Sequence, residues 1–306
     1  MQAIDFINAY YIKLGSGGKY EESGIQENKL RFGWDSWPIE EINQRNWEAL
    51  KDKYQHEYKN KGAATMDINA LKTIVESTSD DIWITFYASK LWWCRVSEGE
   101  AFEDEVSRYR KVDGLWHDHD IHGHPLIINR IPGNISKVQR FQAVVCKVRA
   151  VEELRRLLNN QPSQAFQAIS GAKEGLMQEV EKGLKGLHWK DFEILVDLIF
   201  RNAGWRRTSV MGETMKFVDL ELEEPITGDL YQVQIKSAAT VDDFERYVQN
   251  FSHGSFRKFY FVVHSPEEKL ANYQGIMDEN VELILPRQLA QMVVDFGLTD
   301  WLLKKI

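Results

Sequence analysis

The chain lacks the features that mark several large classes of protein. It has only two cysteines, Cys94 and Cys146, in 306 residues, which is too few for a disulfide scaffold or a four-thiolate zinc site. No apolar run approaches the roughly 20 residues that span a bilayer, and the first residues have no signal-peptide pattern. We therefore expect a cytoplasmic protein with no membrane partner and with buried, free thiols.

A net positive charge is also absent. The chain carries 38 Lys and Arg against 46 Asp and Glu, so its net charge is −8. Residues 1–149 hold 20 basic and 22 acidic side chains, and residues 150–306 hold 18 and 24. This balance excludes a protein that coats nucleic acid nonspecifically, because such binding comes from many cations facing phosphates.

Any contact with DNA must therefore come from local basic groups. Arg206 and Arg207 are one candidate pair for the DNA backbone. Lys137 and Arg140 are another, in a loop over residues 129–141 that combines basic groups with an aromatic residue, as phosphate-contacting segments do. An ordinary solvated loop explains the same residues.

One stretch, residues 190–237, concentrates polar groups on elements of regular structure. Apolar side chains recur at helical spacing over residues 192–200, and Glu193 lies in the first turn of this predicted helix. Gly204 marks its end. The sequence thus predicts an amphipathic helix that carries a carboxylate near its start.

Two strands are predicted after this helix. Apolar and polar residues alternate over 218–223, which places Asp219 at the start of a half-buried strand. A turn leads to a second strand over 231–236. Because residues two apart in a strand face the same way, Gln234 and Lys236 point together.

These four residues suit phosphodiester hydrolysis. Asp219 can hold Mg²⁺ (or Mn²⁺), since Mg²⁺ takes one or two protein carboxylates together with substrate phosphate oxygens. The amide oxygen of Gln234 offers a further ligand, and Glu193 can restore the charge that an acid would supply there. Lys236 would stabilise charge that grows on the phosphate. Taken singly, each residue also fits the solvated face of a strand or helix.

In their order along the chain, these residues resemble a known family. Asp219 followed fifteen residues later by Gln234-x-Lys236, with Phe192-Glu193 on the preceding helix and Gly204-Trp205 after it, is similar to the Mrr-like branch of the PD-(D/E)xK restriction endonucleases. Gln commonly replaces the acid of the (D/E)xK half in that branch. The resemblance covers residues 187–306 and implies a Mg²⁺-dependent endodeoxyribonuclease with an α/β/α fold that restricts foreign, phage DNA.

The remainder of this region continues the alternation of helix and strand. Phe244, Tyr247 and Phe251 follow a helical pattern, the run 259–264 reads as a strand, and a helix begins near Pro286 after a short strand. Such alternation predicts a mixed sheet between helices.

Residues 1–149 have a different composition, rich in tryptophan. Strand-like runs cover 10–14, 30–34, 81–87, 90–96 and 144–148, and helical patterns cover 40–58 and 67–77. Several short strands with one or two helices predict a small β-barrel. Residues 150–186 read as a helical connector to the second domain, so we predict a two-domain α/β protein.

This first half resembles the PUA superfamily, whose EVE-like members accept a flipped nucleobase in an aromatic pocket. The resemblance is carried by residues 14–18, by Phe32-Gly33-Trp34 and by the two adjacent strands at 81–87 and 90–96. It implies a domain that reads a modified base, and we select Trp34, Trp37 and Trp93 as the base- or ligand-binding residues. Most of the tryptophans also suit a core, because aromatics bury the largest apolar area per residue.

Four histidines lie in the run from His117 to His124. His-x-His places two imidazoles on one strand face, which is a zinc-binding pattern. Flanking Gly114, Gly123 and Pro125 indicate a loop instead, and adventitious metal binding is the stronger expectation.

The sequence therefore predicts a modification-dependent DNA endonuclease. Its partner would be double-stranded DNA, and two copies could act together as a homodimer because a double-strand break takes two active sites. Two alternatives stay open. The chain could be an anti-phage effector nuclease gated by a nucleotide messenger or a protein partner. It could also be a nucleic-acid reader that has lost catalysis, and the presence of Gln234 in place of an acid favours this second alternative.

Overall fold

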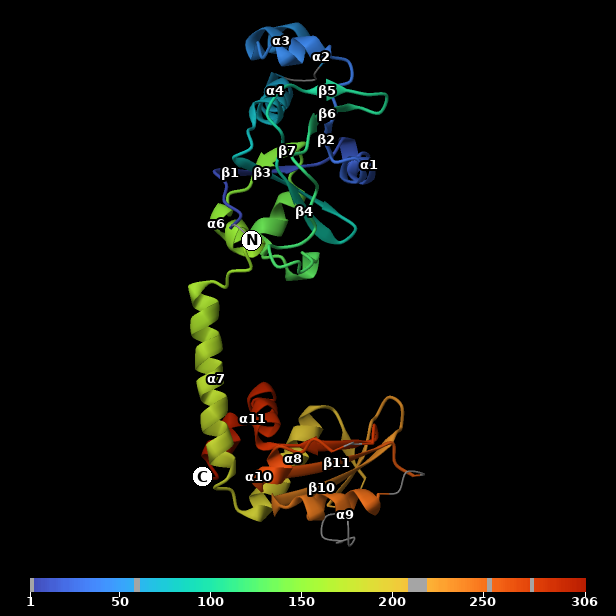
Figure 1. Ribbon diagram of the computed structural model, residues 1–306, viewed down its shortest axis with the longest axis vertical. Coiled ribbons are helices and arrows are strands. Elements are labelled where there is room, and N and C mark those ends of the chain that lie inside the picture. Colours follow the sequence, from blue (N-terminus) through green and yellow to red (C-terminus); the bar gives the residue numbers. More distant parts are fainter. Residues whose placement is uncertain (1–2, 58–60, 209–218, 252–254, 276–277) are drawn as a thin grey trace. The chain divides into compact units, whose positions relative to one another are not determined.

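The computed structural model describes residues 3–57, 61–208, 219–251, 255–275 and 278–306. The chain divides into two compact units, Met1–Gln164 and Ala165–Ile306 (Figure 1). Each unit has its own hydrophobic core and is described separately. None of the described helices is long and apolar enough to cross a membrane.

The first unit mixes short strands with short helices. Its strands are β1 Asn8–Ile12, β2 Lys29–Phe32, β3 Asp81–Tyr87, β4 Lys90–Cys94, β5 Phe102–Glu103, β6 Arg108–Lys111 and β7 Val145–Lys147. Its helices are η1 Ser16–Gly18, α1 Glu21–Gln26, α2 Ile39–Asn43, α3 Trp47–Tyr54, η2 Gln55–Glu57, α4 Lys61–Glu76, η3 Ile128–Arg130, α5 Gly133–Ser136, η4 Lys137–Arg140 and α6 Val151–Leu158.

These strands form two sheets. One has the order β4-β3-β1-β7 and the other the order β2-β6-β5. They meet where the chain continues beyond β4 and β6, because Val96 pairs with Val112 there. Among the described residues of this unit the strands make two joined sheets rather than a closed barrel, so the predicted small β-barrel is confirmed only as a β-rich unit with helices.

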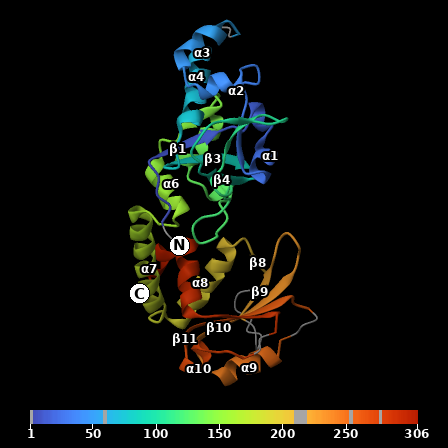
Figure 2. The same ribbon diagram turned by 45° about the horizontal axis from the view of Figure 1, so that its top comes forward.

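Strand β3 lies between the two cores of this unit because its alternate residues face opposite sides. Trp83 packs in the cluster that also contains residues of α3 and α4, whereas Ile82 and Ile84 pack in the cluster that contains Leu154 of α6. Figure 2 shows α2, α3 and α4 gathered at one end of the unit. Burial on both faces explains why β3 reads as an almost continuous apolar run.

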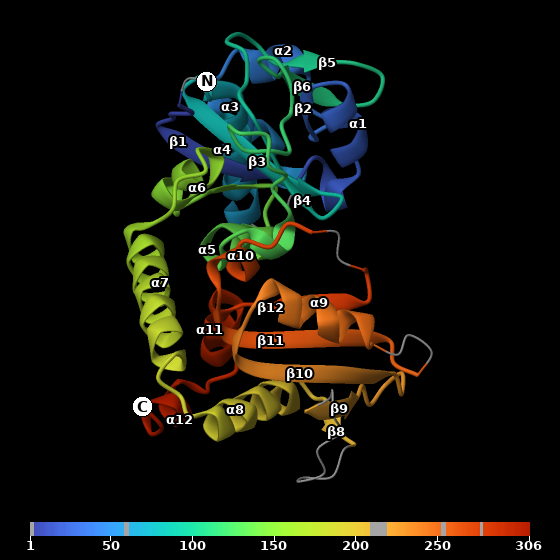
Figure 3. The same ribbon diagram turned by 60° about the horizontal axis from the view of Figure 1, so that its bottom comes forward.

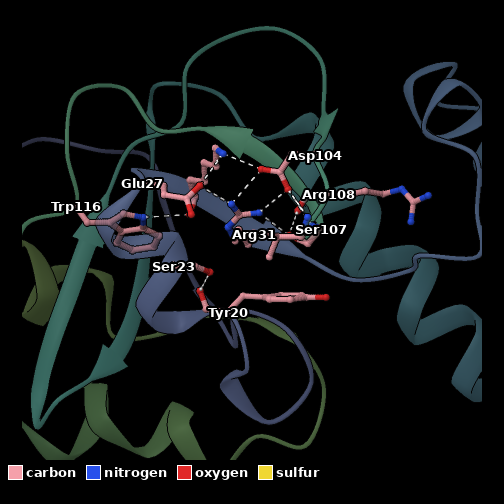
Figure 4. Close-up of polar contacts among 10 residues, drawn as sticks. Tyr20, Ser23, Glu27, Arg31, Asp104, Ser107, Arg108 and Trp116 are labelled. Atoms are coloured by element: carbon pink, nitrogen blue, oxygen red, sulfur yellow. Dashed lines mark hydrogen bonds and ion pairs between the residues drawn. The ribbon is translucent and has the colours of Figure 1, made fainter.

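The first unit also buries three arginines on the adjacent strands β2 and β6: Arg31, Arg108 and Arg110. The guanidinium of Arg31 lies between Asp104 and Glu27 and also donates to the hydroxyl of Ser107 (Figure 4). Arg110 donates instead to backbone carbonyls, including that of Val75 at 2.7 Å. Burying a cation is costly unless it is compensated. Carboxylates and hydrogen bonds compensate Arg31, whereas carbonyl acceptors compensate Arg110.

The second unit alternates helices and strands more regularly. Its elements are α7 Gln164–Leu184, α8 Trp189–Asn202, β8 Arg206–Arg207, β9 Leu220–Glu223, β10 Leu230–Ala239, α9 Val241–Gln249, β11 Lys258–Pro266, α10 Glu268–Ala271, β12 Val281–Ile284, α11 Pro286–Asp295 and α12 Thr299–Leu303. Of the predicted strand at 218–223, Val218 lies outside the described residues.

A five-stranded mixed sheet with the order β12-β11-β10-β9-β8 forms the centre of this unit. Strands β10, β11 and β12 run parallel and lie side by side in Figure 3, whereas β9 pairs antiparallel with β10. One core packs α8 and α11 on one face of the sheet, and another packs α9 and α10 on the opposite face. The predicted mixed sheet between two helical layers is confirmed.

The segment predicted as a connector, 150–186, contains two helices with different partners. Helix α6 contributes Leu154 and Leu158 to a core of the first unit. Helix α7 contributes Val180 and Leu184 to a core of the second unit. The two compact units meet in sequence between them.

Candidate active site

Helix α8 carries Glu193 to the edge of the second unit's core. Phe192, Leu195 and Val196 are buried against the sheet, and Glu193 beside them is half-buried. The helix ends before Gly204, whose φ of 93° lies in the left-handed region that favours glycine. The sequence pattern thus fixes both the start of the helix and the side on which Glu193 lies.

Asp219 lies one residue before β9, against the neighbouring strand β10. Its backbone N–H donates to the carbonyl of Val233 at 3.0 Å, which extends the β9–β10 pairing to this residue. Its carboxylate oxygen Oδ2 accepts from the backbone N–H of Ile235 at 2.6 Å and from the side-chain amide of Gln234. Two donors from β10 therefore hold the carboxylate in place.

Gln234 and Lys236 share one face of β10, as their spacing predicts. Val233 and Ile235 pack in the core on the α8 side of the sheet. Gln234 pairs in register with Phe261, whose ring contacts Phe244 of α9, so Gln234 faces the α9 side.

The amine of Lys236 lies on the same side. Its Nζ is 5.0 Å from the ring centre of Tyr247 on α9. Lys236 forms no ion pair within 4 Å with any carboxylate of the described residues. The amine therefore has an aromatic neighbour but no bound counter-charge.

Both carboxylates of the site titrate abnormally. Burial raises the pKa of Asp219, and the N–H of Ile235, the charge of Lys236 and the amide of Gln234 offset part of that shift. Burial also raises the pKa of Glu193, and the nearby charge of Asp219 raises it further, while Arg207 and Lys236 act in the opposite direction. Asp219 and Lys236 both act on Glu193, although Glu193 is carried by α8 and the other two by the segment before β9 and by β10.

The donor set fits a hard divalent cation. The side-chain oxygen Oε1 of Gln234 is buried and has no hydrogen-bond partner among the described residues. An unpaired buried acceptor is costly unless something binds it, and a cation between it and two carboxylates would satisfy all three. Asp219, Gln234 and Glu193 are the three groups. The described residues contain no cluster of three or more His, Cys, Asp or Glu side chains arranged for a metal, and this site holds only two carboxylates.

A residue that the sequence pattern did not single out supports the rim of this site. Asp197 lies one helical turn after Glu193 and is buried, although it is acidic. Its carboxylate pairs with Arg201 at 2.9 Å and with Arg207 at 3.9 Å. Its spacing of four residues places it one turn from Glu193, but no sequence signal marks its burial, because an acidic residue in a helix ordinarily lies on the solvated face.

The two arginines of β8 are placed differently. Arg207 is largely covered and acts on the charge of Glu193, whereas Arg206 is exposed. Successive residues of a strand point to opposite faces, so only Arg207 turns toward the α8 side. Residues 209–218, which include Lys216, lie outside the described part of the chain.

The three tryptophans selected in the first unit have different surroundings. Trp37 is 1% exposed and stacks on Tyr54 at 4.7 Å between ring centres, so it is a core side chain. Trp93 stacks on His117 at 4.6 Å and its indole N–H donates to the carbonyl of His119. Trp34 is only partly buried, has a positive φ of 66°, and donates to Asp67.

Contacts with its own aspartates and with Trp93 hold the histidine-rich loop, residues 117–124, in place. Asp118 lies between Lys90 and His119, and Asp120 accepts from His124. Lys137 and Arg140 are exposed on η4, some distance along the chain. In the second unit Gln234 donates to Asp219, the charge of Lys236 acts on Asp219, and both Asp219 and Lys236 act on Glu193. Lys137, Arg140 and the three selected tryptophans belong to the first unit.

Comparison with known proteins gives little support of its own. No protein-family model matches the chain, and no curated protein matches it. Among solved structures, the DNA modification-dependent restriction endonuclease AspBHI is similar at 11% identity and a TM-score of 0.31, over 74% of this chain and 69% of that one. A TM-score this low does not establish a shared fold, so nothing about this chain is inferred from that enzyme.

Proposed function

We propose that the second unit is a metal-dependent endonuclease site that cuts DNA. The observation that carries the proposal is the carboxylate of Asp219, which accepts from Gln234 and Ile235 of β10, together with a buried side-chain oxygen of Gln234 that has no hydrogen-bond partner among the described residues. The charge of Lys236 acts on Asp219, and the charge of Asp219 acts on Glu193. The proposed cofactor is Mg²⁺ or Mn²⁺, held by Asp219, Gln234 and Glu193.

Each residue of the proposed site would have a separate role in phosphodiester hydrolysis. A bound divalent cation supplies polarisation of the phosphoryl oxygen and a more acidic water. Asp219, held by the N–H of Ile235, gives the site its fixed negative charge. Lys236 has no carboxylate partner within 4 Å among the described residues, so its charge is available to the scissile phosphate as negative charge develops there.

The DNA contacts and the selectivity belong to the same proposal. Arg206 and Arg207 of β8 would contact the backbone of double-stranded DNA. Since the chain carries a net charge of −8, general attraction to DNA is weak, and selectivity for modified foreign DNA would come from the first unit. Trp34 remains a candidate for reading a modified base, whereas Trp37 and Trp93 are omitted because both are buried in cores of the first unit.

Selective cleavage is the experiment that tests this function. DNA carrying modified bases and unmodified DNA of the same sequence would be incubated with the protein and Mg²⁺. We expect the modified DNA to be cut and the unmodified DNA to remain largely intact. Equal cutting of both would remove the base-reading role and keep the nuclease, and no cutting of any DNA with either Mg²⁺ or Mn²⁺ would reject the nuclease.

A further inference from the structure

A cationic feature lies in the first unit, which contains none of the residues of the proposed nuclease site. The sequence over residues 121–149 holds five Lys or Arg and no Asp or Glu, in a chain whose acidic residues are otherwise in excess. Four of these cations, Lys137, Arg140, Lys147 and Arg149, line one cavity of about 500 Å³. We refer to this cavity as the cationic groove.

The groove is built from two separate elements. Lys137 and Arg140 come from η4, and Lys147 and Arg149 come from β7 and its continuation, where they are two residues apart and both exposed. Val148 between them is fully buried in the unit's core. Alternation along the strand therefore turns both cations outward, to the same side.

No carboxylate lines the groove. The remaining lining residues are Val138, Phe141 and Cys146. None of the four cations forms an ion pair within 4 Å with a carboxylate of the described residues. Lys147 donates to the neutral side chain of Asn8 at 2.8 Å, and Lys137 lies 3.5 Å from the side-chain oxygen of Asn134. Four like charges repel one another, so such a groove costs stability unless an anion occupies it.

A fifth cation forms a hydrogen bond to the backbone of Phe141, the aromatic residue that lines the groove. Lys13 of the segment after β1 donates its Nζ to the backbone carbonyl of Phe141 at 2.5 Å. The ring of Phe141 is 43% exposed and also lines a neighbouring cavity of about 420 Å³, together with Tyr10 and Met66. Exposed aromatic surface beside cationic side chains is typical of a groove that binds nucleic acid, because cations contact phosphates and aromatic rings stack on bases.

We propose that the cationic groove binds the sugar–phosphate backbone of the DNA that the second unit is proposed to cut. The inference extends the proposed function by giving the first unit its own DNA contact, made by Lys147 and Arg149 of β7 as well as by Lys137 and Arg140. Several cations on two elements match the repeated charges of a strand, whereas a single small anion needs only one or two.

Equilibrium binding without cleavage tests this inference. The full chain would be titrated onto fluorescently labelled duplex DNA in EDTA, at several salt concentrations, and compared with the double variant Lys147→Gln/Arg149→Gln. The matched control is Lys72→Gln/Lys111→Gln, which removes two exposed cations of the same unit that do not line the groove. Thermal unfolding of each variant shows whether the unit remains folded.

The groove variant should bind about tenfold more weakly at low salt, and the slope of log K against log salt should fall by about 2, one for each lost phosphate contact. The control should change both values much less. Equal losses in the two double variants would overturn the inference. Full displacement of the DNA by an equimolar mononucleotide would also overturn it, in favour of a small nucleotide ligand.

The readout separates this inference from the proposed nuclease. Binding in EDTA needs no metal and no turnover, so a protein that binds DNA through the groove but never cuts it would reject the nuclease alone. A protein that cuts DNA with unchanged affinity in the groove variant would reject the groove alone.

Discussion

The two units each bury charge, but they do so in opposite ways. In the first unit, Asp104 is surrounded by Arg31, Lys29 and two backbone N–H groups, and the hydrogen bond from Arg31 holds the pKa of this carboxyl well below its usual range. In the second unit, burial raises the pKa of Asp219, and no cation lies within 4 Å of its carboxylate among the described residues.

The difference separates a structural cluster from a binding site. Around Arg31 two cations and two carboxylates form direct ion pairs, so the cluster offers no unpaired charge to a ligand. Around Asp219, no cation of the described residues lies within 4 Å of the carboxylate, and the side-chain oxygen of Gln234 has no hydrogen-bond partner among those residues, so both groups can still accept a cation. Uncompensated charge is more frequent at functional sites than in structural ion pairs, which is why we assign function to the second cluster only.

The largest effect should come from removing the uncompensated acid. Asp219→Ala should lower the rate of DNA cleavage by about 10²–10³-fold, because the site loses the carboxylate that is to hold the cation. The measurement is single-turnover cleavage with Mg²⁺. Asp242→Ala, an exposed acid on α9, is the matched control and should cut at the wild-type rate; a similar loss in both would contradict the assignment.

Breaking the balanced cluster should affect stability instead. Asp104→Asn leaves Arg31 buried with weaker partners, and the first unit should lose about 1.5–3 kcal/mol in denaturant unfolding. Cleavage by the folded protein should be unchanged. Asp52→Asn, at an exposed position on α3, should cost almost nothing. Unaltered stability of Asp104→Asn would show that this cluster is not the stabilising element described.

The two acids should also respond to pH with opposite signs. The folded-state pKa of Asp104 is lowered, so its stabilisation is present above the ordinary carboxyl value and is lost as pH falls through it toward the folded-state value. The folded-state pKa of Asp219 is raised, so the folded state favours the protonated acid and stability declines as pH rises above the ordinary value.

Asp219→Asn should therefore stabilise the second unit in EDTA at neutral pH, because it removes the cost of burying the charged acid. Mg²⁺ should raise the melting temperature of the wild type and not that of the variant, because only the wild type binds it in the folded state. A variant that is less stable than wild type in EDTA, or that keeps the Mg²⁺ effect, would contradict the description of an uncompensated acid.

The smallest effect should come from the aromatic neighbour of Lys236. Tyr247→Leu removes a cation–π contact worth about 0.5–1 kcal/mol and should lower cleavage only a few-fold. Tyr247→Phe keeps the ring and should restore the wild-type rate. If Tyr247→Phe cleaved DNA as slowly as Tyr247→Leu, the hydroxyl of Tyr247 rather than its ring would be the group that supports cleavage.

Sequence patterns predict the second unit well because its elements are regular. The helix that carries Glu193 and the strand that carries Gln234 and Lys236 have the apolar periodicity of half-buried elements, and the structure has both at these positions. The burial of Asp197 could not be predicted from these patterns, because an acidic residue in a helix is ordinarily assigned to the solvated face.

The first unit was harder to predict for a physical reason. Strand β6 has the sequence Arg-Tyr-Arg-Lys, and its inward side chains are the buried Arg108 and Arg110, so the alternation of apolar and polar residues that identifies a strand is missing. The sheet that β6 completes could not be predicted without it. The prediction that Trp37 binds a base or ligand is wrong, because its ring is buried and stacks on Tyr54.

The central claim is that the second unit hydrolyses DNA through Lys236 and a metal held beside it. The most direct test compares cleavage of supercoiled plasmid and of modified DNA by the wild type and by Lys236→Ala, with Mg²⁺ and with EDTA; Lys269→Ala, an exposed lysine on α10, is the control. We predict Mg²⁺-dependent cutting by the wild type and by the control, and a loss of about 10²–10³-fold in Lys236→Ala. Cutting that persists in Lys236→Ala, or in EDTA, would contradict the claim.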